Sequence, residues 1–232
     1  MYAQLADILR RKIDSGEWIA DQKIPSENEL NQQYGISRMT ARQVLSQLVS
    51  EQLLFRVQGK GTFVARPKIS TRSLAYKGIR EQLEAMGYAI TTKVLESTEI
   101  EADAVLARIL RLDPGDRVHL IRRLRLIEDE PISLHISYVP ESLAPELDTR
   151  DLVTRQLCTI LETDHGLRMT KVTERLESTL PIARDAKDLQ VRRTAPLLLL
   201  THEIADQADR PFEYSRILFR GDKVQLEFKY EL

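Results

Sequence analysis

Two closely spaced helix starts within residues 26–37 constrain the fold of this chain more than any other feature. Ser26 is followed three residues later by Glu29, which is the spacing of a capping box at a helix N-terminus. Gly35 ends that short segment, and Ser37 offers a second N-cap two residues further on. We therefore expect a short helix, a turn of about three residues and a second helix, which is the arrangement of a helix-turn-helix.

Apolar periodicity on both sides of this turn predicts a small three-helix unit. Residues 2–15 carry apolar side chains at helical spacing and are followed by Gly16, so they predict a first helix. Trp18 and Ile24 are expected to pack beneath it. The helix that starts at Ser37 has one apolar face, formed by Ala41, Val44, Leu45, Leu48 and Val49.

A glycine-rich hairpin is expected directly after the third helix. Residues 54–57 and 62–64 are typical of strands, and "QGKG" at 58–61 predicts the turn between them. Glycines allow such a turn to approach a phosphate or the floor of the minor groove closely. The turn is not a P-loop, because the spacing G-x-x-x-x-G-K-[ST] is missing. The hairpin therefore resembles the wing of a winged helix, with Lys60 at its tip.

Polar side chains gather where the third helix begins, with Arg38 and Arg42 four residues apart. Taken singly, the two arginines are ordinary surface residues and "GKG" is a plain hairpin turn. Taken together within residues 1–66, these features predict a winged helix-turn-helix whose second motif helix enters the major groove of DNA. The guanidinium fork of arginine suits guanine O6 and N7, whereas the point charge of Lys60 suits phosphate.

The segment from "GEWIADQKIPSENELNQQYG" to "KGTFVA" closely resembles the winged-helix domain of the GntR family of bacterial transcription regulators. The resemblance covers essentially all of residues 1–66. It departs at Asn28, where many members carry arginine. The resemblance implies DNA contacts from the recognition helix and the wing, by Ser37, Arg38, Thr40, Arg42, Gln43, Gln58, Gly59, Lys60 and Gly61.

The charge distribution agrees with a DNA-binding front end. Residues 1–68 hold ten Lys or Arg and seven Asp or Glu, and the rest of the chain holds 24 and 28, so charges of +3 and −4 make up the net −1. No run of 18 apolar residues predicts a membrane span, and the N-terminus has no signal-peptide core, so we expect a cytoplasmic protein. The single cysteine, Cys158, and four scattered histidines give no metal-binding spacing, and no metal or cofactor is expected.

The rest of the chain predicts a second domain of the α+β class. Residues 67–74 are polar, contain no periodicity and are expected to link domain 1–66 to domain 75–232. Alternating and turn signals predict a mostly antiparallel sheet with helices on it. The expected strands are 91–102, 117–127, 132–139, 168–180, 196–205, 212–220 and 224–232; the expected helices lie within 76–88, 102–111, 150–164 and 183–191.

This second domain resembles the UTRA effector-binding domain of the HutC-type subfamily, which is similar in fold to chorismate lyase. The segments that carry the resemblance are "RRLRL", "EPISLHISYVPESLAPEL" and "RPFEYSRILFRGD". It implies an effector-binding and dimerisation domain over 75–232. It also implies that the effector-binding cavity is lined by Lys77, Gly78, Ile79, Arg80, Arg123, Arg125, His135, Tyr138, Glu174, Glu213 and Phe219.

The positions of Arg123 and Arg125 in the sequence also indicate an anion, independently of the resemblance. They lie two apart on one expected strand, so their side chains share a face of the sheet. Buried guanidinium groups need either a protein carboxylate, such as Glu213, or an anionic ligand, and the residues leave both open. Amino-sugar-phosphate-sensing relatives tend to have Ser and Thr where this chain has "KGIR", and an acid at His135. A phosphosugar and a small carboxylate such as urocanate, sensed by the subfamily's namesake, both remain open.

The resemblance implies a ligand-responsive transcription regulator that acts as a repressor. Such a protein binds a palindromic DNA operator as a homodimer and is released or repositioned by a small anionic metabolite. Two alternatives are a chorismate-lyase-like enzyme fused to a DNA-binding head and a winged helix used for protein contacts. Against the enzyme, the histidines are scattered and no nucleophile motif is present.

Overall fold

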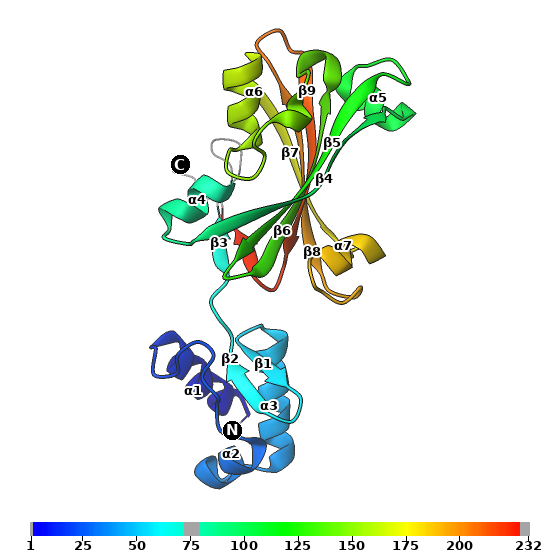
Figure 1. Cartoon of the computed structure of the whole chain (residues 1–232). Coiled ribbons are helices and arrows are strands. Elements are labelled where there is room, and N and C mark those ends of the chain that lie inside the picture. The colour runs from blue at the N-terminus through cyan, green and yellow to red at the C-terminus, as the bar shows by residue number, and fades with distance from the viewer. Residues whose placement is uncertain (1, 72–78, 228–232) are drawn as a thin grey trace, which may run out of the picture. The chain divides into compact units, whose positions relative to one another are not determined.

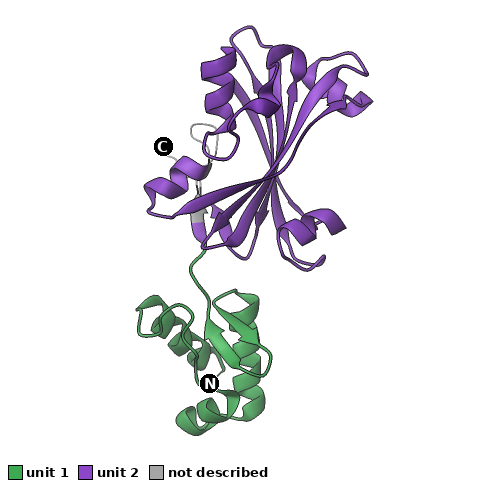
Figure 2. Ribbon diagram, in the orientation of Figure 1, with its two compact units in different colours: residues 1–68 green, residues 69–232 purple. Residues whose placement is uncertain are grey.

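A computed structural model describes residues 2–71 and 79–227 of the chain. The chain forms two compact units, Met1–Lys68 and Ile69–Leu232 (Figure 2). No helix in the described ranges is both long and apolar enough to cross a membrane. Lys77 and Gly78, two of the expected effector contacts, lie outside the described residues.

The first unit is the expected winged helix-turn-helix (Figure 1). The capping box at Ser26 is present, because its hydroxyl accepts from Glu29 N while the Glu29 carboxylate accepts from Ser26 N at 2.7 Å. Gly35 ends the second helix in the left-handed conformation that glycine adopts without strain. The elements are α1 Tyr2–Asp14, α2 Glu27–Tyr34, α3 Arg38–Ser50, β1 Leu54–Val57 and β2 Gly61–Val64.

The apolar face of α3 anchors this unit. Ala41, Val44 and Leu48 have no exposed surface, and they pack with Leu9 of α1 and Leu30 of α2. Trp18 and Ile24 pack against the same core, as the sequence predicts. Burial of this apolar face leaves the polar side of α3 toward solvent.

The second unit is built on a six-stranded antiparallel sheet with the order β4-β5-β6-β9-β8-β7. Long β5 and β6 form the central hairpin that the turn at residues 128–129 predicts. The strands are β4 Ile90–Glu101, β5 Arg117–Ile127, β6 Glu130–Pro140, β7 Lys171–Thr179, β8 Leu197–Ala205 and β9 Pro211–Arg220. The predicted α+β class is therefore confirmed.

Helices cover both faces of this sheet (Figure 1). We call the face that carries α4 Ile79–Ala85 and α6 Leu157–His165 the inner face, and the face that carries α5 Ala104–Leu110 and α7 Ala183–Asp188 the outer face. On the inner face Ile160 of α6 packs on Ile121 of β5. Two short 3-10 helices, η1 Glu141–Leu143 and η2 Leu147–Thr149, follow β6.

Three local features differ from the sequence expectation. The expected linker 67–74 contains strand β3 Ile69–Thr71, which pairs in parallel with β10 Val224–Leu226. The helix expected from residue 150 starts at Leu157, because the Asp151 carboxylate accepts from Val153 N and Thr154 N and favours a turn.

The third difference is a β-bulge in β4. The register shifts between Val94, whose cross-strand partner is Arg123, and Glu96, whose cross-strand partner is Arg122. Thr92, Val94 and Glu96 were expected to share one face of the strand. The extra residue moves Glu96 to the outer face, because successive side chains alternate between faces and the bulge adds one position.

Candidate nucleic-acid interface and anion site

The start of α3 presents a compact polar surface. The Ser37 hydroxyl caps the helix by accepting from Thr40 N at 3.1 Å and lies 2.9 Å from the Thr40 hydroxyl. Arg38, Arg42 and Gln43 are all exposed on the side away from the core. Among the described residues, none forms an ion pair or hydrogen bond with the Arg38 guanidinium, so that group can contact an external partner.

Arg42 is held by an acidic side chain of α2. Its Nε donates to both carboxylate oxygens of Glu27, at 3.2 and 3.0 Å, yet 60% of the Arg42 side chain stays exposed. Arg56 of β1 approaches the same carboxylate at 3.9 Å and donates to the Ser46 hydroxyl at 3.0 Å. Glu27 and Arg56 were not predicted as part of this surface, because no spacing in the sequence links them to α3.

The wing lies at the turn between β1 and β2. Gln58, Gly59, Lys60 and Gly61 are all exposed. Gly61 has φ 129°, and a Cβ there would lie 2.8 Å from Cε of Lys23. Phe55 and Phe63 stack at 5.6 Å between ring centroids and stiffen the hairpin. The turn is therefore a glycine-shaped loop that presents Lys60 to solvent.

The inner face of the second unit holds two buried arginines next to each other on β5. Arg123 and Arg125 are 4% and 2% exposed and pair with Val94 and Thr92 across the β4–β5 ladder, so they share a face as predicted. Nε and Nη1 of Arg123 and Nε of Arg125 have no hydrogen-bond acceptor. Arg125 Nη1 donates to the Thr92 hydroxyl.

Arg122, the neighbouring arginine on the same strand, is a buried guanidinium that carboxylates of the protein neutralise. Arg122 points to the outer face, where Nη2 lies 3.0 Å from Asp185 and 2.8 Å from Asp188 of α7. In contrast, no described carboxylate forms an ion pair with Arg123 or Arg125. Glu213, which the sequence offers as a partner for these arginines, acts on Arg123 through its charge, but no ion pair or hydrogen bond joins the two side chains among the described residues.

Burial dominates the electrostatics of this inner cluster. It lowers the pKa of Arg123, which the nearby Glu213 carboxylate opposes. Burial, with the charges of Arg123 and Arg80, lowers the pKa of Arg125 to about 9. Burial and the same two β5 arginines hold the pKa of His135 well below 6.5. An anion placed here would meet unsatisfied N–H donors and the positive charge of two buried guanidinium groups.

Further polar groups extend this cluster across the sheet. His135 pairs with Arg123 across the β5–β6 ladder, lies 3.1 Å from the Ser133 hydroxyl and meets Phe219 edge to face at 6.4 Å. Glu213 accepts from the Ser215 hydroxyl. On the next strands His202 Nε2 lies 2.9 Å from the Glu174 carboxylate.

Some expected effector contacts lie elsewhere or are already engaged. Tyr138 faces the outer side, because it pairs with Leu120 in the β5–β6 ladder and stacks on Tyr214 at 6.0 Å. It is therefore not brought together with Arg123. Arg80 donates to the carbonyls of Val153 and Thr154, both at 2.9 Å. Ile79 begins α4.

Comparison with known proteins matches both units separately. Residues 1–64 match the model of the family described as bacterial regulatory proteins, gntR family, and residues 85–225 match the UTRA domain. The HTH-type transcriptional repressor NagR of Bacillus subtilis is 31% identical over 223 residues, which cover 96% of this chain and 91% of the relative. The histidine utilization repressor of Pseudomonas putida is 28% identical over 230 residues, covering 99% of this chain and 92% of that protein.

Solved structures agree with these matches. The crystal structure of PhnF from Mycobacterium smegmatis superimposes with a TM-score of 0.69 at 27% identity, covering 97% of this chain and 98% of that one. The matching families and relatives are transcription regulators, so the enzyme alternative is not favoured. The chain therefore belongs to the GntR family of bacterial regulatory proteins and, with its UTRA domain, to the HutC-type subfamily.

Proposed function

We propose that this protein is a repressor that binds an inverted-repeat operator as a dimer and loses affinity for it when a small anionic metabolite binds on the inner face of the UTRA domain. The observation that carries the effector part is the pair Arg123 and Arg125. Both are buried, and together they hold three guanidinium nitrogens without an acceptor. Leaving such donors buried and unpaired is costly, so a site of this kind favours an anion that accepts from them.

The operator contacts rest on the exposed start of α3 and the wing. Arg38 and Arg42 supply two guanidinium forks for base edges, and Ser37, Thr40 and Gln43 lie beside them. The exposed Gln58–Gly61 turn offers Lys60 and backbone N–H groups for phosphate. DNA bound in this way places the protein where the bacterial chromosome is, in the cytoplasm.

Dimerisation is supported by the geometry of operators and by one edge of the sheet. A single winged helix covers one half-site, so an inverted repeat needs two copies related by a twofold axis. The edge strand β7 and the irregular residues between it and α7 expose Leu176, Leu180 and Ile182, of which Ile182 is 63% exposed. Exposed apolar side chains along a sheet edge favour burial against a second copy.

The names of relatives do not single out one class of effector. They include a repressor of histidine utilization, a repressor of a mannosyl-D-glycerate transport/metabolism system and a protein named as a probable repressor of a fructoselysine utilization operon. Two guanidinium groups are compatible with a carboxylate or a phosphate. Both a sugar phosphate and a small carboxylate therefore belong in the panel.

The experiment uses the full chain and operator DNA selected in vitro by the chain itself. Thermal unfolding is measured with inorganic phosphate, sugar phosphates and small carboxylates, and each compound that raises Tm is then tested for release of the operator. We expect at least one anion to stabilise the protein and weaken operator binding, and Arg123→Met to abolish both effects while operator binding without ligand persists. If no anion in the panel acts, or if Arg123→Met responds like the parent protein, the effector proposal fails.

A further inference from the structure

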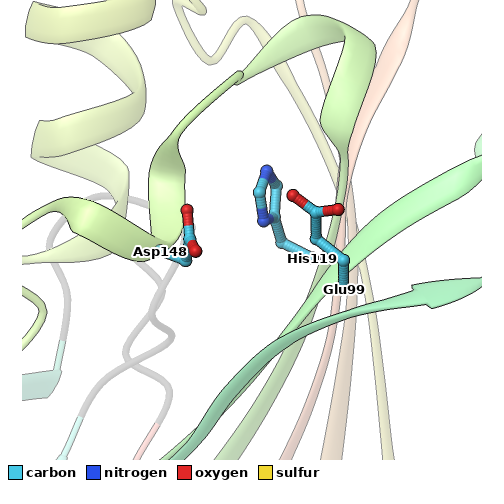
Figure 3. Close-up of side chains that lie close together, drawn as sticks. All are labelled: Glu99, His119 and Asp148. Atoms are coloured by element: carbon cyan, nitrogen blue, oxygen red, sulfur yellow. The ribbon is translucent and has the colours of Figure 1, made fainter.

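Three potential metal ligands converge at the edge of the inner face, apart from the arginine pair. Glu99 of β4, His119 of β5 and Asp148 of η2 each offer one ligand atom, and these atoms all lie within 4.8 Å of one another. Figure 3 shows the imidazole ring of His119 between the carboxylate groups of Asp148 and Glu99. Glu99 and His119 are direct cross-strand partners, which fixes their side chains on one face.

The histidine is held in the form that a metal ligand requires. Nε2 of His119 lies 2.9 Å from the Ala144 carbonyl oxygen, which can only accept, so Nε2 carries the proton. His119 is 1% exposed, and its Nδ1 is buried without a hydrogen-bond partner. Metal-binding histidines typically donate their second ring N–H to a carbonyl or carboxylate in this way, which orients the ring and leaves the other nitrogen bare.

The two carboxylates differ in how accessible they are. Glu99 is partly buried and already accepts from Arg117 Nη2 through Oε2, which leaves Oε1 for another partner. Asp148 is exposed, so an ion can reach the cluster from solvent along its side. The site therefore combines one buried nitrogen donor, two oxygen donors and an open approach.

We propose that Glu99, His119 Nδ1 and Asp148 bind a divalent first-row transition ion, with Zn²⁺ as the best-matched probe. Zinc accepts one imidazole nitrogen and carboxylate oxygens at about 2.0–2.2 Å and leaves a fourth position for water. The imidazole disfavours Mg²⁺ and Ca²⁺, which select oxygen donors. Binding would fasten η2, which lies in the segment between β6 and α6, to the β4–β5 edge of the sheet.

The sequence does not predict this site, because the three ligands come from three separate segments and do not form a short motif. A second arrangement of the same groups is a protonated His119 whose Nδ1–H is drawn to the two carboxylates. The two arrangements differ in their response to metal, since a protonated Nδ1 has no lone pair to donate. This difference defines the experiment.

The test titrates the metal-free full chain with Zn²⁺ by calorimetry and by competition with a chromophoric chelator. We expect one Zn²⁺ per chain and a rise in Tm on binding. Glu99→Gln and Asp148→Asn should each weaken Zn²⁺ binding by about 10-fold or more, since even loss of an outer-shell partner costs about 10–100-fold. Glu101→Gln, which removes an exposed carboxylate two residues along the same strand, is the matched control and should bind as the parent does.

His119→Gln should abolish Zn²⁺ binding, but it also removes a buried hydrogen bond to Ala144. If His119→Gln does not fold, the Zn²⁺ affinity of Asp148→Asn, a substitution at an exposed residue, tests the proposal in its place. Nitrogen NMR of His119 supplies an independent readout, in which Zn²⁺ should shift the Nδ1 resonance. The proposal is overturned if Zn²⁺ does not bind in a 1:1 ratio. Undiminished binding by Glu99→Gln and Asp148→Asn, or a His119 Nδ1 that stays protonated in the presence of Zn²⁺, would overturn it as well.

Discussion

Arg42 of the recognition helix and Glu27 of α2 form a bidentate ion pair, in which Arg42 Nε lies 3.2 and 3.0 Å from the two carboxylate oxygens. Because 60% of the Arg42 side chain remains exposed, the pair orients the guanidinium at the surface and does not bury it. Arg38, four residues earlier, has no such partner among the described residues. Arg42 is thus an arginine whose direction is set before DNA arrives, which lowers the entropy lost on binding.

The first prediction concerns sequence discrimination by Arg42. Arg42→Ala should lower the preference for operator over scrambled DNA by roughly 1–3 kcal/mol, because a bidentate contact to guanine supplies about that much discrimination. The two affinities are measured by fluorescence anisotropy at one salt concentration. An equal loss of affinity for both DNAs would assign Arg42 to the phosphate backbone.

The second prediction concerns the wing. Lys60→Ala should weaken binding to all DNA sequences alike and reduce the slope of log affinity against log salt by about 0.9, since one phosphate contact is lost. Salt titrations with operator and scrambled DNA measure this slope. Lys187→Ala, an exposed lysine of α7 in the other unit, is the control and should leave the slope unchanged. An unchanged slope for Lys60→Ala would remove the wing tip from the interface.

Local signals predicted most of the fold. The capping box at Ser26, the left-handed Gly35 and the cap at Ser37 are each encoded within a few residues, and all appear in the structure. Strand β5, Arg117–Ile127, matches its expected range. Strand β3 was missed because its partner, β10, lies more than 150 residues away in sequence. A pairing between such distant segments leaves no local signal in the sequence.

The candidate effector site was predicted less completely, for the same reason. Alternation along a strand was enough to place Arg123 and Arg125 on one face. It could not place Asp185 against Arg122, because that contact depends on how α7 packs on the sheet. Tyr138 was assigned to the site by resemblance, whereas the pairing register puts it on the outer face. The parts of the candidate effector site that could not be predicted therefore depend on contacts between elements that are distant in sequence.

The third prediction is a loss of stability in mild acid. Burial, with the charges of Arg125 and Arg123, holds the pKa of His135 well below 6.5, whereas in the unfolded chain this histidine takes up a proton near pH 6.5. The unfolded state then binds more protons, so the free energy of unfolding falls as the pH drops below 6.5, by up to about 1.4 kcal/mol per pH unit. Urea unfolding between pH 7 and about pH 5 should show a shallower decline for His135→Gln. Parallel declines in the two proteins would show that His135 does not carry this effect.

The fourth prediction uses the two neighbouring arginines of β5 as a matched pair. Arg123→Met should lower the free energy of unfolding of the ligand-free protein much less than Arg122→Met does, because Nε and Nη1 of Arg123 have no acceptor to lose and Met keeps the apolar volume. Arg122→Met should lower it by about 3–5 kcal/mol, because Asp185 and Asp188 lose their counter-charge. Both values come from urea unfolding at neutral pH. Equal destabilisation by the two substitutions would mean that groups inside the protein satisfy Arg123 as fully as Asp185 and Asp188 satisfy Arg122, and the anion site would lose its physical basis.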